Sequence, residues 1–247
     1  MKLLIDGDIL LYKAASRVEK IFDWGDDLWS IAADLREAQG LVTCALAEIE
    51  SDLGSEETVF CISDSKNFRK DIYPEYKGNR NNRKPLCYAA LRDWAMKALP
   101  SVCWPKLEAD DVMGIMATGP FEGDSIIVTI DKDLKCIPGR HYNPDKKGVV
   151  TTVDPQEAYE FHLIQAIAGD STDNIKGVPG MGMVKAERLL KKHGFTWQTV
   201  LDAYGDSDQG REDALLNARL TKILTDREWD FAKQEVIMWT PTKELSC

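Results

Sequence analysis

The sequence predicts an α/β fold in which a mostly parallel central sheet is flanked by helices. Short apolar runs bounded by turn residues have the length and composition of buried strands, and the clearest of them is Ile126–Ile130. Stretches with apolar residues at helical spacing separate these runs. Because strands that alternate with helices tend to pair in parallel and to be covered on both faces, this order favours the α/β class.

The first half of the chain is expected to supply two strands and three helices. They are strands at residues 2–5 and 58–62, and helices at residues 29–49, 88–99 and from 107 onward. Asp6 and Asp64 follow the two strands closely. The carboxyl ends of parallel strands are where open α/β sheets bind ligands, so these aspartates are candidate site residues.

The second half begins with strands and then becomes helical. The expected elements are strands at residues 126–130 and 149–153, a Gly/Pro-rich turn at 177–182, a polar loop at 205–213, and helices at 156–168, 183–193 and 214–239. We therefore expect an α/β domain over residues 1–153 and a helical region over residues 154–247.

Composition restricts the class of protein. The 247 residues carry a net charge of −10, and no apolar run approaches the ~20 residues of a membrane span. The start of the chain runs into Asp6 too soon for a signal peptide. Six scattered cysteines without a C-x-x-C pair and only three histidines disfavour disulfides, zinc and a Ser-His-Asp triad. The expected location is the cytoplasm, with no membrane partner.

Acidic residues recur where the predicted strands end and where helices begin. Asp131 and Asp133 have the i, i+2 spacing that points both to one side of an extended chain. The candidate metal ligands are Asp6, Asp64, Glu108, Asp110, Asp111, Asp131, Asp133, Asp170 and Asp173. Like charges ~4 Å apart repel by about 4 kcal/mol, so a converging set needs cations or shared protons. All-oxygen ligands select Mg²⁺ or Mn²⁺ and would suit a two-metal site; the alternative is that each acid only caps a strand or helix.

A basic stretch follows Asp64 in this acidic protein. Between residues 66 and 84 two acidic residues stand against seven basic ones, namely Lys66, Arg69, Lys70, Lys77, Arg80, Arg83 and Lys84. We interpret residues 65–84 as a mobile, partly helical excursion that overhangs the metals, with Lys77 and Arg80 holding the scissile phosphate. Tyr73 and Tyr76 either stack on an unpaired base or pack inside the protein. The alternative for the whole stretch is a solvated loop.

A glycine-rich turn between helices gives a second candidate contact with a phosphate backbone. Its backbone N–H groups and nearby lysines are placed to approach a duplex, which makes candidates of Lys176, Gly177, Val178, Gly180, Gly182 and Lys185. The alternative is a tight structural turn.

Taken together, these segments resemble the flap endonuclease family of 5′-nucleases. The resemblance rests on Leu4–Asp8, Ile62–Asp64, Tyr76–Arg80, Leu107–Gly114, Ile130–Asp133, Gly169–Asp173 and Gly177–Gly182, which occur in family order. The set is most similar to the 5′→3′ exonucleases of short-tailed bacteriophages. It implies a fold of the PIN/5′-nuclease type, two Mg²⁺ ions held by the acids above with Mn²⁺ able to substitute, and Asp111 outside the direct ligands.

The resemblance also implies a substrate and its contacts. It implies an arch at about residues 65–87 that carries Lys77 and Arg80, and a helix–hairpin–helix over residues 174–192 that grips duplex DNA, often with a bound K⁺. The expected activity is 5′→3′ exonucleolytic hydrolysis of duplex DNA, with 5′-flap cleavage and RNase H-type removal of primers from RNA–DNA hybrids. Lys77, Arg80, Asp131 and Asp133 are the expected catalytic residues, and replication proteins are candidate partners.

Two other classes of function stay open from the sequence. A phosphatase would use Asp6 as nucleophile and Asp8 as acid, through a covalent aspartyl phosphate. A non-catalytic DNA-binding module would need no metal, although nine converging acids would weaken its binding to DNA.

Overall fold

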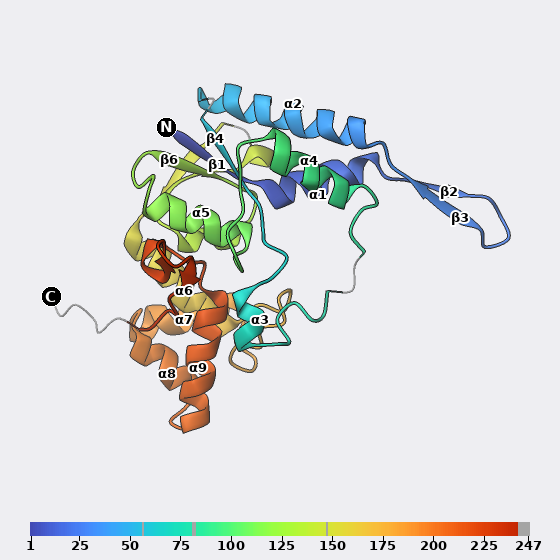
Figure 1. Cartoon of the computed structure of the whole chain (residues 1–247). Helices are drawn as coiled ribbons and strands as arrows, with labels where there is room; N and C mark the ends of the chain where they lie inside the picture. Colours follow the sequence, from blue (N-terminus) through green and yellow to red (C-terminus); the bar gives the residue numbers. More distant parts are fainter. Residues whose placement is uncertain (56, 81–82, 147, 242–247) are drawn as a thin grey trace.

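The computed structural model describes residues 1–55, 57–80, 83–146 and 148–241 (Figure 1). Its centre is a six-stranded sheet with the strand order β5-β4-β1-β6-β7-β8. The strands are β1 (Lys2–Asp6), β4 (Thr58–Cys61), β5 (Ser101–Val102), β6 (Ser125–Val128), β7 (Gly139–Tyr142) and β8 (Val150–Val153). Neighbouring strands pair in parallel except β8, which is antiparallel to β7. The predicted mostly parallel α/β sheet is confirmed.

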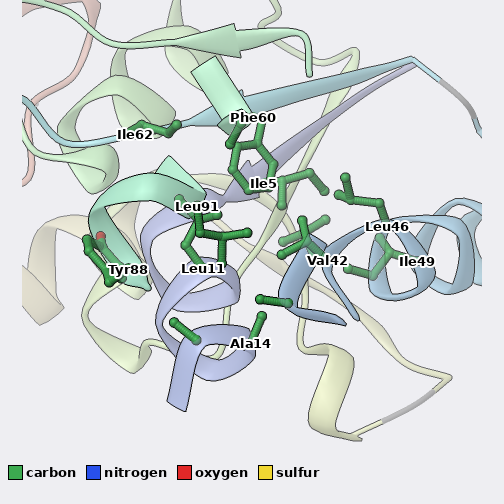
Figure 2. Close-up of a cluster of buried hydrophobic side chains, with 14 of the residues drawn as sticks. Ile5, Leu11, Ala14, Val42, Leu46, Ile49, Phe60, Ile62, Tyr88 and Leu91 are labelled. Carbon is green, nitrogen blue, oxygen red and sulfur yellow. The ribbon is translucent and has the colours of Figure 1, made fainter. Parts of the chain in front are cut away.

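Side chains alternate across the sheet, so each face has its own core. Leu3 and Ile5 of β1 join the cluster under α1 (Gly7–Val18), α2 (Leu35–Leu53) and α4 (Tyr88–Ala98), which Figure 2 shows in close-up. Leu4 points the other way and packs with α5 (Ala109–Thr118). Burying a side chain of this size contributes about 1.5–3 kcal/mol to stability. Because the sheet is covered on both faces, consecutive residues of its central strands are buried, and their sequences are therefore apolar throughout.

Four helices form a second cluster below the sheet in Figure 1. They are α6 (Pro155–Ala168), α7 (Met183–His193), α8 (Trp197–Tyr204) and α9 (Asp208–Thr221). A loop was predicted at 205–213 and a helix over 214–239. Helix α9 instead begins at Asp208 and ends at Thr221, so the prediction is wrong at both ends of the helix. Ser207 caps α9 by accepting a hydrogen bond from the N–H of Gly210. At the other end the Arg69 guanidinium donates to the carbonyl oxygens of Leu220 and Lys222, where a longer helix would use them internally.

The chain after α9 extends instead of continuing as a helix. It forms the short strands β9 (Trp229–Asp230) and β10 (Glu235–Val236), which pair with each other. Trp229 is buried and its ring stacks on Trp104 with centroids 5.5 Å apart. This packing against the second core explains why the apolar spacing here does not belong to a helix.

The N-terminal region also differs from the prediction. Helix α1 was not expected, and residues 29–32 do not begin a helix but form β3 (Trp29–Ala32), which pairs with β2 (Lys20–Asp23) in a separate hairpin. Helix α2 begins only at Leu35 because the Asp34 carboxylate accepts from the N–H groups of Arg36 and Glu37. Within the described ranges, no helix has both the length and the apolar character needed to cross a bilayer.

Candidate metal and nucleic-acid site

The paired register of β1 and β6 brings the first acids together. Ile5 lies opposite Val128, so Asp6 and the residues after β6 emerge at the same edge of the sheet. The hydroxyl of Thr129 donates to Asp6 (2.8 Å) and accepts from the N–H of Asp131 (3.0 Å). Thr129 therefore positions both acids. Sequence reasoning missed it, although a hydroxyl inside the apolar run 126–130 was the available signal.

Electrostatics at this edge favour a bound cation. Burial, opposed by the hydrogen bonds from Thr129 and Ile9 and reinforced by Asp8 and Asp131, raises the pKa of Asp6 to about 7. Burial and the charges of Asp6 and Asp131 raise the pKa of Asp110 well above its ordinary value. Carboxyl groups in this situation need a proton or a hard cation nearby, and their oxygen atoms are the ligand type that Mg²⁺ and Mn²⁺ prefer.

A cleft of about 840 Å³ runs from this edge to the helical region. The predicted acids on its wall are Glu108, Asp110, Asp131, Asp133, Asp170 and Asp173. Burial, followed by the charges of Asp131 and Asp170, raises the pKa of Asp133 to about 6. Acids from three separate parts of the chain thus share one cleft. Among the described residues, no three of these acids lie close enough together to form a complete metal-binding site.

Cations face these acids across the cleft. Lys77 forms ion pairs with Glu108 and, at 3.5 Å, with Asp173, and the Arg80 guanidinium also pairs with Asp173. Burial opposes ionisation of Glu108, but Lys77, Arg69 and the Tyr76 hydroxyl outweigh it and hold the pKa at about 2. Lys77 and Arg80 are therefore held beside the carboxylates by direct charge pairing.

The loop that carries Asp170 and Asp173 is shaped by two glycines. Gly169 and Gly177 have positive φ values of 67° and 62°, and their backbones pack so closely that a Cβ on either would meet main-chain atoms 2.4–2.5 Å away. Asp170 and Ile175 exchange backbone hydrogen bonds of 2.9 and 2.7 Å, which closes the loop. Glycine at these positions is needed for the backbone, because any side chain would force the loop open.

The segment that was expected to form a mobile arch is docked onto this loop in its described part. Asn79 donates to the carbonyl of Ser171 (2.8 Å), and Asn174 donates to that of Glu75 (2.9 Å). The N–H of Lys77 donates to the carbonyl of Asp173 at 2.9 Å. Through Arg80 the predicted arch is thus joined to the 169–177 loop by hydrogen bonds, and its residues 81 and 82 lie outside the described residues.

Arg69 and Asp111 form a buried ion pair and not part of the open site. Arg69 is 3% exposed and Asp111 is fully buried, with two parallel hydrogen bonds of 2.7 and 2.8 Å between them. Asp111 also accepts from the N–H groups of Glu108 and Leu224. The predictions of Arg69 as a DNA contact and Asp111 as a metal ligand are therefore wrong, because both are already saturated and enclosed.

Two further site residues, Tyr76 and Asp64, lie differently from the prediction. Tyr76 is buried against Ile175 and donates to Glu108 and Asp173, so of the two open interpretations it is a packing residue and not a stacking platform. Asp64 does not line the cleft, and its oxygens accept from the N–H groups of Ser65 and Lys106. The hydrogen bond from Lys106 is the main reason why its pKa is lowered.

The remaining basic residues differ in their availability. Lys66, Lys70, Lys176 and Lys185 are exposed. Arg83 is also exposed but forms an ion pair with Glu19, and the Lys84 ammonium lies 4.5 Å from the Tyr88 ring centroid.

The Gly-rich turn offers fewer N–H groups to a phosphate than expected. The N–H of Val178 donates to the carbonyl of Ile167 at 2.8 Å, so the predicted contact through Val178 is wrong. Gly180 and Gly182 are exposed, and no described residue accepts from their N–H groups. The Lys185 ammonium donates to the carbonyl of Gly180, which ties the start of α7 to the turn.

The pair Asp6 and Asp8 does not have the arrangement of a phosphatase. Asp6 is 4% exposed and caps α1 through the N–H of Ile9. Asp8 turns away and accepts from the N–H of Ser63 and the Tyr88 hydroxyl. The two carboxyl groups thus serve different neighbours and do not face a common substrate.

Comparison with known proteins agrees with this geometry. The exonuclease of Escherichia phage T7 is 26% identical, over 97% of this chain and 93% of the phage protein. DNA polymerase I of Bacillus caldotenax is 29% identical over 68% of this chain and 22% of the polymerase. The crystal structure of the bacteriophage T5 flap endonuclease superposes with a TM-score of 0.67 at 15% identity, over 90% of this chain and 89% of that one, which supports the same fold. Residues 1–160 match the family described as 5′-3′ exonuclease, N-terminal resolvase-like domain, and the chain belongs to that family.

Proposed function

We propose that this chain is a divalent-metal-dependent 5′→3′ exonuclease acting on duplex DNA with a free 5′ end or a 5′ flap. The observation that carries the proposal is the cleft in which acids from α5, the end of β6 and the 169–177 loop face Lys77 and Arg80. An array of acids alone would repel DNA, whereas acids filled with divalent cations and flanked by basic side chains would attract it. The T7 relative is named as an exonuclease, and relatives from Shewanella as flap endonucleases.

The donors divide into two groups by their place in the chain and by the charges that act on them. Burial and the charge of Asp131 raise the pKa values of Asp6 and Asp110, and these three acids would hold one Mg²⁺. Burial and the charges of Asp131 and Asp170 raise the pKa of Asp133, which would hold a second ion together with Asp170 and Asp173. Glu108 lies on the cleft wall with Asp110, Asp131, Asp133, Asp170 and Asp173 and would add a carboxylate to the set. Asp64, predicted as a metal ligand, stays in the proposal as a ligand although it does not line the cleft. When bound, such ions polarise the phosphodiester and lower the pKa of the attacking water. Mn²⁺ has the same ligand preference and would substitute.

The protein's own groups would bind and orient the DNA. Lys77 and Arg80, which line the cleft, would hold the scissile phosphate and stabilise the negative charge that develops on it. Lys176 and Lys185, with the N–H groups of Gly180 and Gly182, would hold the duplex backbone. We include in the proposal a K⁺ ion bound by carbonyl oxygens of the 177–182 turn. The proposed function further includes the removal of primers from RNA–DNA hybrids, and the proposed partners include replication proteins.

Substitution of Asp131 by Asn tests the proposal. Asn keeps an oxygen to accept from the N–H of Asp133, as Asp131 does at 2.9 Å, but removes the charge that a metal needs. Cleavage of a 5′-labelled duplex and a 5′-flap substrate in Mg²⁺ should fall by at least ~100-fold, because several kcal/mol of transition-state stabilisation are lost.

The control is Asp93→Asn, an equivalent change on the exposed side of α4. It should leave cleavage unchanged, and both variants should bind DNA about as well as the parent. Retained turnover in Asp131→Asn would contradict the metal assignment. Cleavage of a small phosphate ester but not of DNA would return the molecule to the phosphatase class.

A further inference from the structure

Helix α6 contains a buried polar side chain that has no partner in the protein. Gln165 is 7% exposed. Among the residues that the structure describes, its amide oxygen is the single enclosed side-chain nitrogen or oxygen atom without a hydrogen bond. Its amide nitrogen donates to none of the described residues either. Both ends of this amide are therefore left over by the fold.

An unpaired amide in this position costs stability. A buried oxygen that has given up its hydrogen bonds with water and gains none in return destabilises the folded state. Leucine or methionine would fill a similar volume without that cost. The backbone gives no reason for a glutamine, because its carbonyl oxygen accepts from the N–H of Gly169 as any residue near the end of a helix does. The amide thus needs a partner that the chain alone does not supply.

The position of Gln165 in the fold indicates what this partner is. Helix α6 packs against the 3₁₀ helix η1 (Lys132–Cys136), which carries Asp133. After Ala168 the same helix runs directly into the loop that carries Asp170. Gln165 lines the cleft together with both acids. It therefore lies where the two segments that carry the acids proposed for the second ion meet.

A carboxamide oxygen suits a hard divalent cation. Such cations bind carbonyl oxygens of asparagine and glutamine besides carboxylates, and Mg²⁺ keeps several water molecules that need hydrogen-bond acceptors. A neutral oxygen also adds no repulsion to the acids that already lie there. Turning the Gln165 amide toward the cleft breaks no hydrogen bond with a described residue, so the side chain is free to meet an ion.

A DNA phosphate is a less favourable partner for this amide. The cleft that Gln165 lines also contains Asp131, Asp133 and Asp170, and a phosphate can approach these carboxylates only once cations have neutralised them. The exposed side chains of Lys132 and Lys176 line the same cleft and offer a phosphate full positive charges.

We propose that Gln165 contributes a neutral oxygen, directly or through a water molecule, to the divalent cation held by Asp133, Asp170 and Asp173. This inference rests on the proposed function, which assigns a cation to those three acids. Gln165 is then a positioning residue for the ion and does not touch the DNA. The cost of its unpaired oxygen in the cation-free fold is relieved when the ion binds.

Gln165→Leu separates this role from a structural one. In EDTA its melting temperature should exceed that of the parent by at least ~2 °C, because the unpaired amide is gone. Calorimetric titration with Mn²⁺ in the absence of DNA should show one of the two ions bound ~10–100-fold more weakly. Gln165→Glu keeps an oxygen and adds a charge, so it should bind Mn²⁺ at least as tightly as the parent. Asp170→Asn should lose the same ion, and adding Gln165→Leu to it should cause no further loss.

The matched control is Gln156→Leu in the first turn of the same helix, where the side chain is exposed and lies outside the cleft wall. It should leave Mn²⁺ binding unchanged. Equal Mn²⁺ affinity of the parent and Gln165→Leu overturns the inference. A lower melting temperature of Gln165→Leu in EDTA also overturns it, because the amide would then stabilise the fold. So does weaker DNA binding in EDTA with unchanged Mn²⁺ binding, which would assign the amide to a phosphate. A parent that binds no Mn²⁺ refutes the proposed function itself.

Discussion

At the scale of single residues, the chemistry at the sheet edge depends on groups that are not themselves acidic. The Thr129 hydroxyl donates to Asp6 and accepts from the N–H of Asp131, and its donation works against the rise in the pKa of Asp6. Groups that orient metal ligands in this way commonly account for 10–100-fold in metal affinity or activity. The metal affinity of such a site therefore depends partly on the residues that orient its ligands.

Replacing Thr129 with Val should lower cleavage of a 5′-labelled duplex by ~10–100-fold, because the nearly isosteric side chain cannot hydrogen-bond to either neighbour. Thr129→Ser retains the hydroxyl and should restore most of the activity. Titration of Mn²⁺ by calorimetry should show weaker binding to the Val variant. Equal activity of the Val and Ser variants would show that this hydroxyl does not position the acids.

The acids and the basic residues differ in how well their roles could be predicted. Asp131 and Asp133 could be placed because an acid at a strand end emerges at a known edge of a parallel sheet. Arg69 could not, because whether an arginine faces solvent or a buried carboxylate depends on which helices pack over it. Its sequence neighbourhood is the same basic stretch that supplies Lys77 and Arg80 to the cleft.

At the scale of elements, one buried ion pair joins three parts of the chain. Arg69 in α3 (Phe68–Ile72) binds Asp111 in α5 and the carbonyl oxygens at the end of α9. This arrangement fixes the segment before Lys77 against the helical region. The pair therefore contributes to the site through position and not through contact with substrate.

Removal of one partner of this pair should be strongly destabilising. Asp111→Ala removes the bidentate partner of the buried Arg69 guanidinium and leaves only Glu108, 3.4 Å away, at a cost of about 3–5 kcal/mol. Arg69→Met/Asp111→Leu removes both charges and should lose less than the sum of the losses in Arg69→Met and in Asp111→Leu. Urea denaturation of the parent, these two single variants and the double variant measures this coupling. Loss of activity in Asp111→Asn without loss of stability would instead support a direct role in metal binding.

The interface of α6 and α9 contains a titratable group with a strongly shifted pKa. Burial, reinforced by the charge of Lys222, lowers the pKa of His162 to about 3, and its ring nitrogen lies 2.9 Å from the carbonyl of Ala218. The imidazole is therefore neutral in the fold. Because the unfolded chain takes up this proton near pH 6.5, the free energy of unfolding should fall as the pH drops from about 6.5 toward about 3.

His162→Gln tests this linkage, since the amide can still donate to Ala218 but does not titrate. Each pH unit below about 6.5 should cost the parent ~1.4 kcal/mol that the variant does not lose. Unfolding curves at pH 7, 6 and 5 measure the difference. Parallel loss of stability in both proteins would place the acid sensitivity elsewhere.

Helices and strands were predictable where the local pattern of apolar residues alone determined them. Strands β1, β4 and β6 were found because they are apolar on both faces, and α6 and α7 because their spacing is undisturbed. Strands β5 and β7 of the same sheet were not expected. The hairpin at residues 20–32 was missed because its apolar side chains are exposed, which no periodicity of burial reveals. The end of α9 was missed because Arg69, distant in sequence, captures its last carbonyl groups.

At the scale of the whole molecule, charge is strongly segregated. The chain carries a net charge of −10, yet exposed cations lie around a cleft whose wall is acidic. Long-range attraction of DNA must therefore come from the local basic groups and from the cations that the acids hold. The salt dependence of DNA binding reports directly on which of these groups meet phosphate.

Substitution of Lys77 and Arg80 tests most directly which basic groups contact the phosphates of DNA. Each phosphate contact contributes a slope of ~0.9 in log K against log salt, so Lys77→Ala/Arg80→Ala should flatten the slope by about two contacts. Binding of a 5′-flap duplex, followed by fluorescence anisotropy in Ca²⁺ at several salt concentrations, measures it. Lys20→Ala/Lys97→Ala removes two exposed charges that lie outside the basic stretch and the cleft wall, and serves as the matched control. An unchanged slope with lost cleavage would mean that Lys77 and Arg80 act by neutralising Glu108 and Asp173, with which they already pair, and not by holding the DNA.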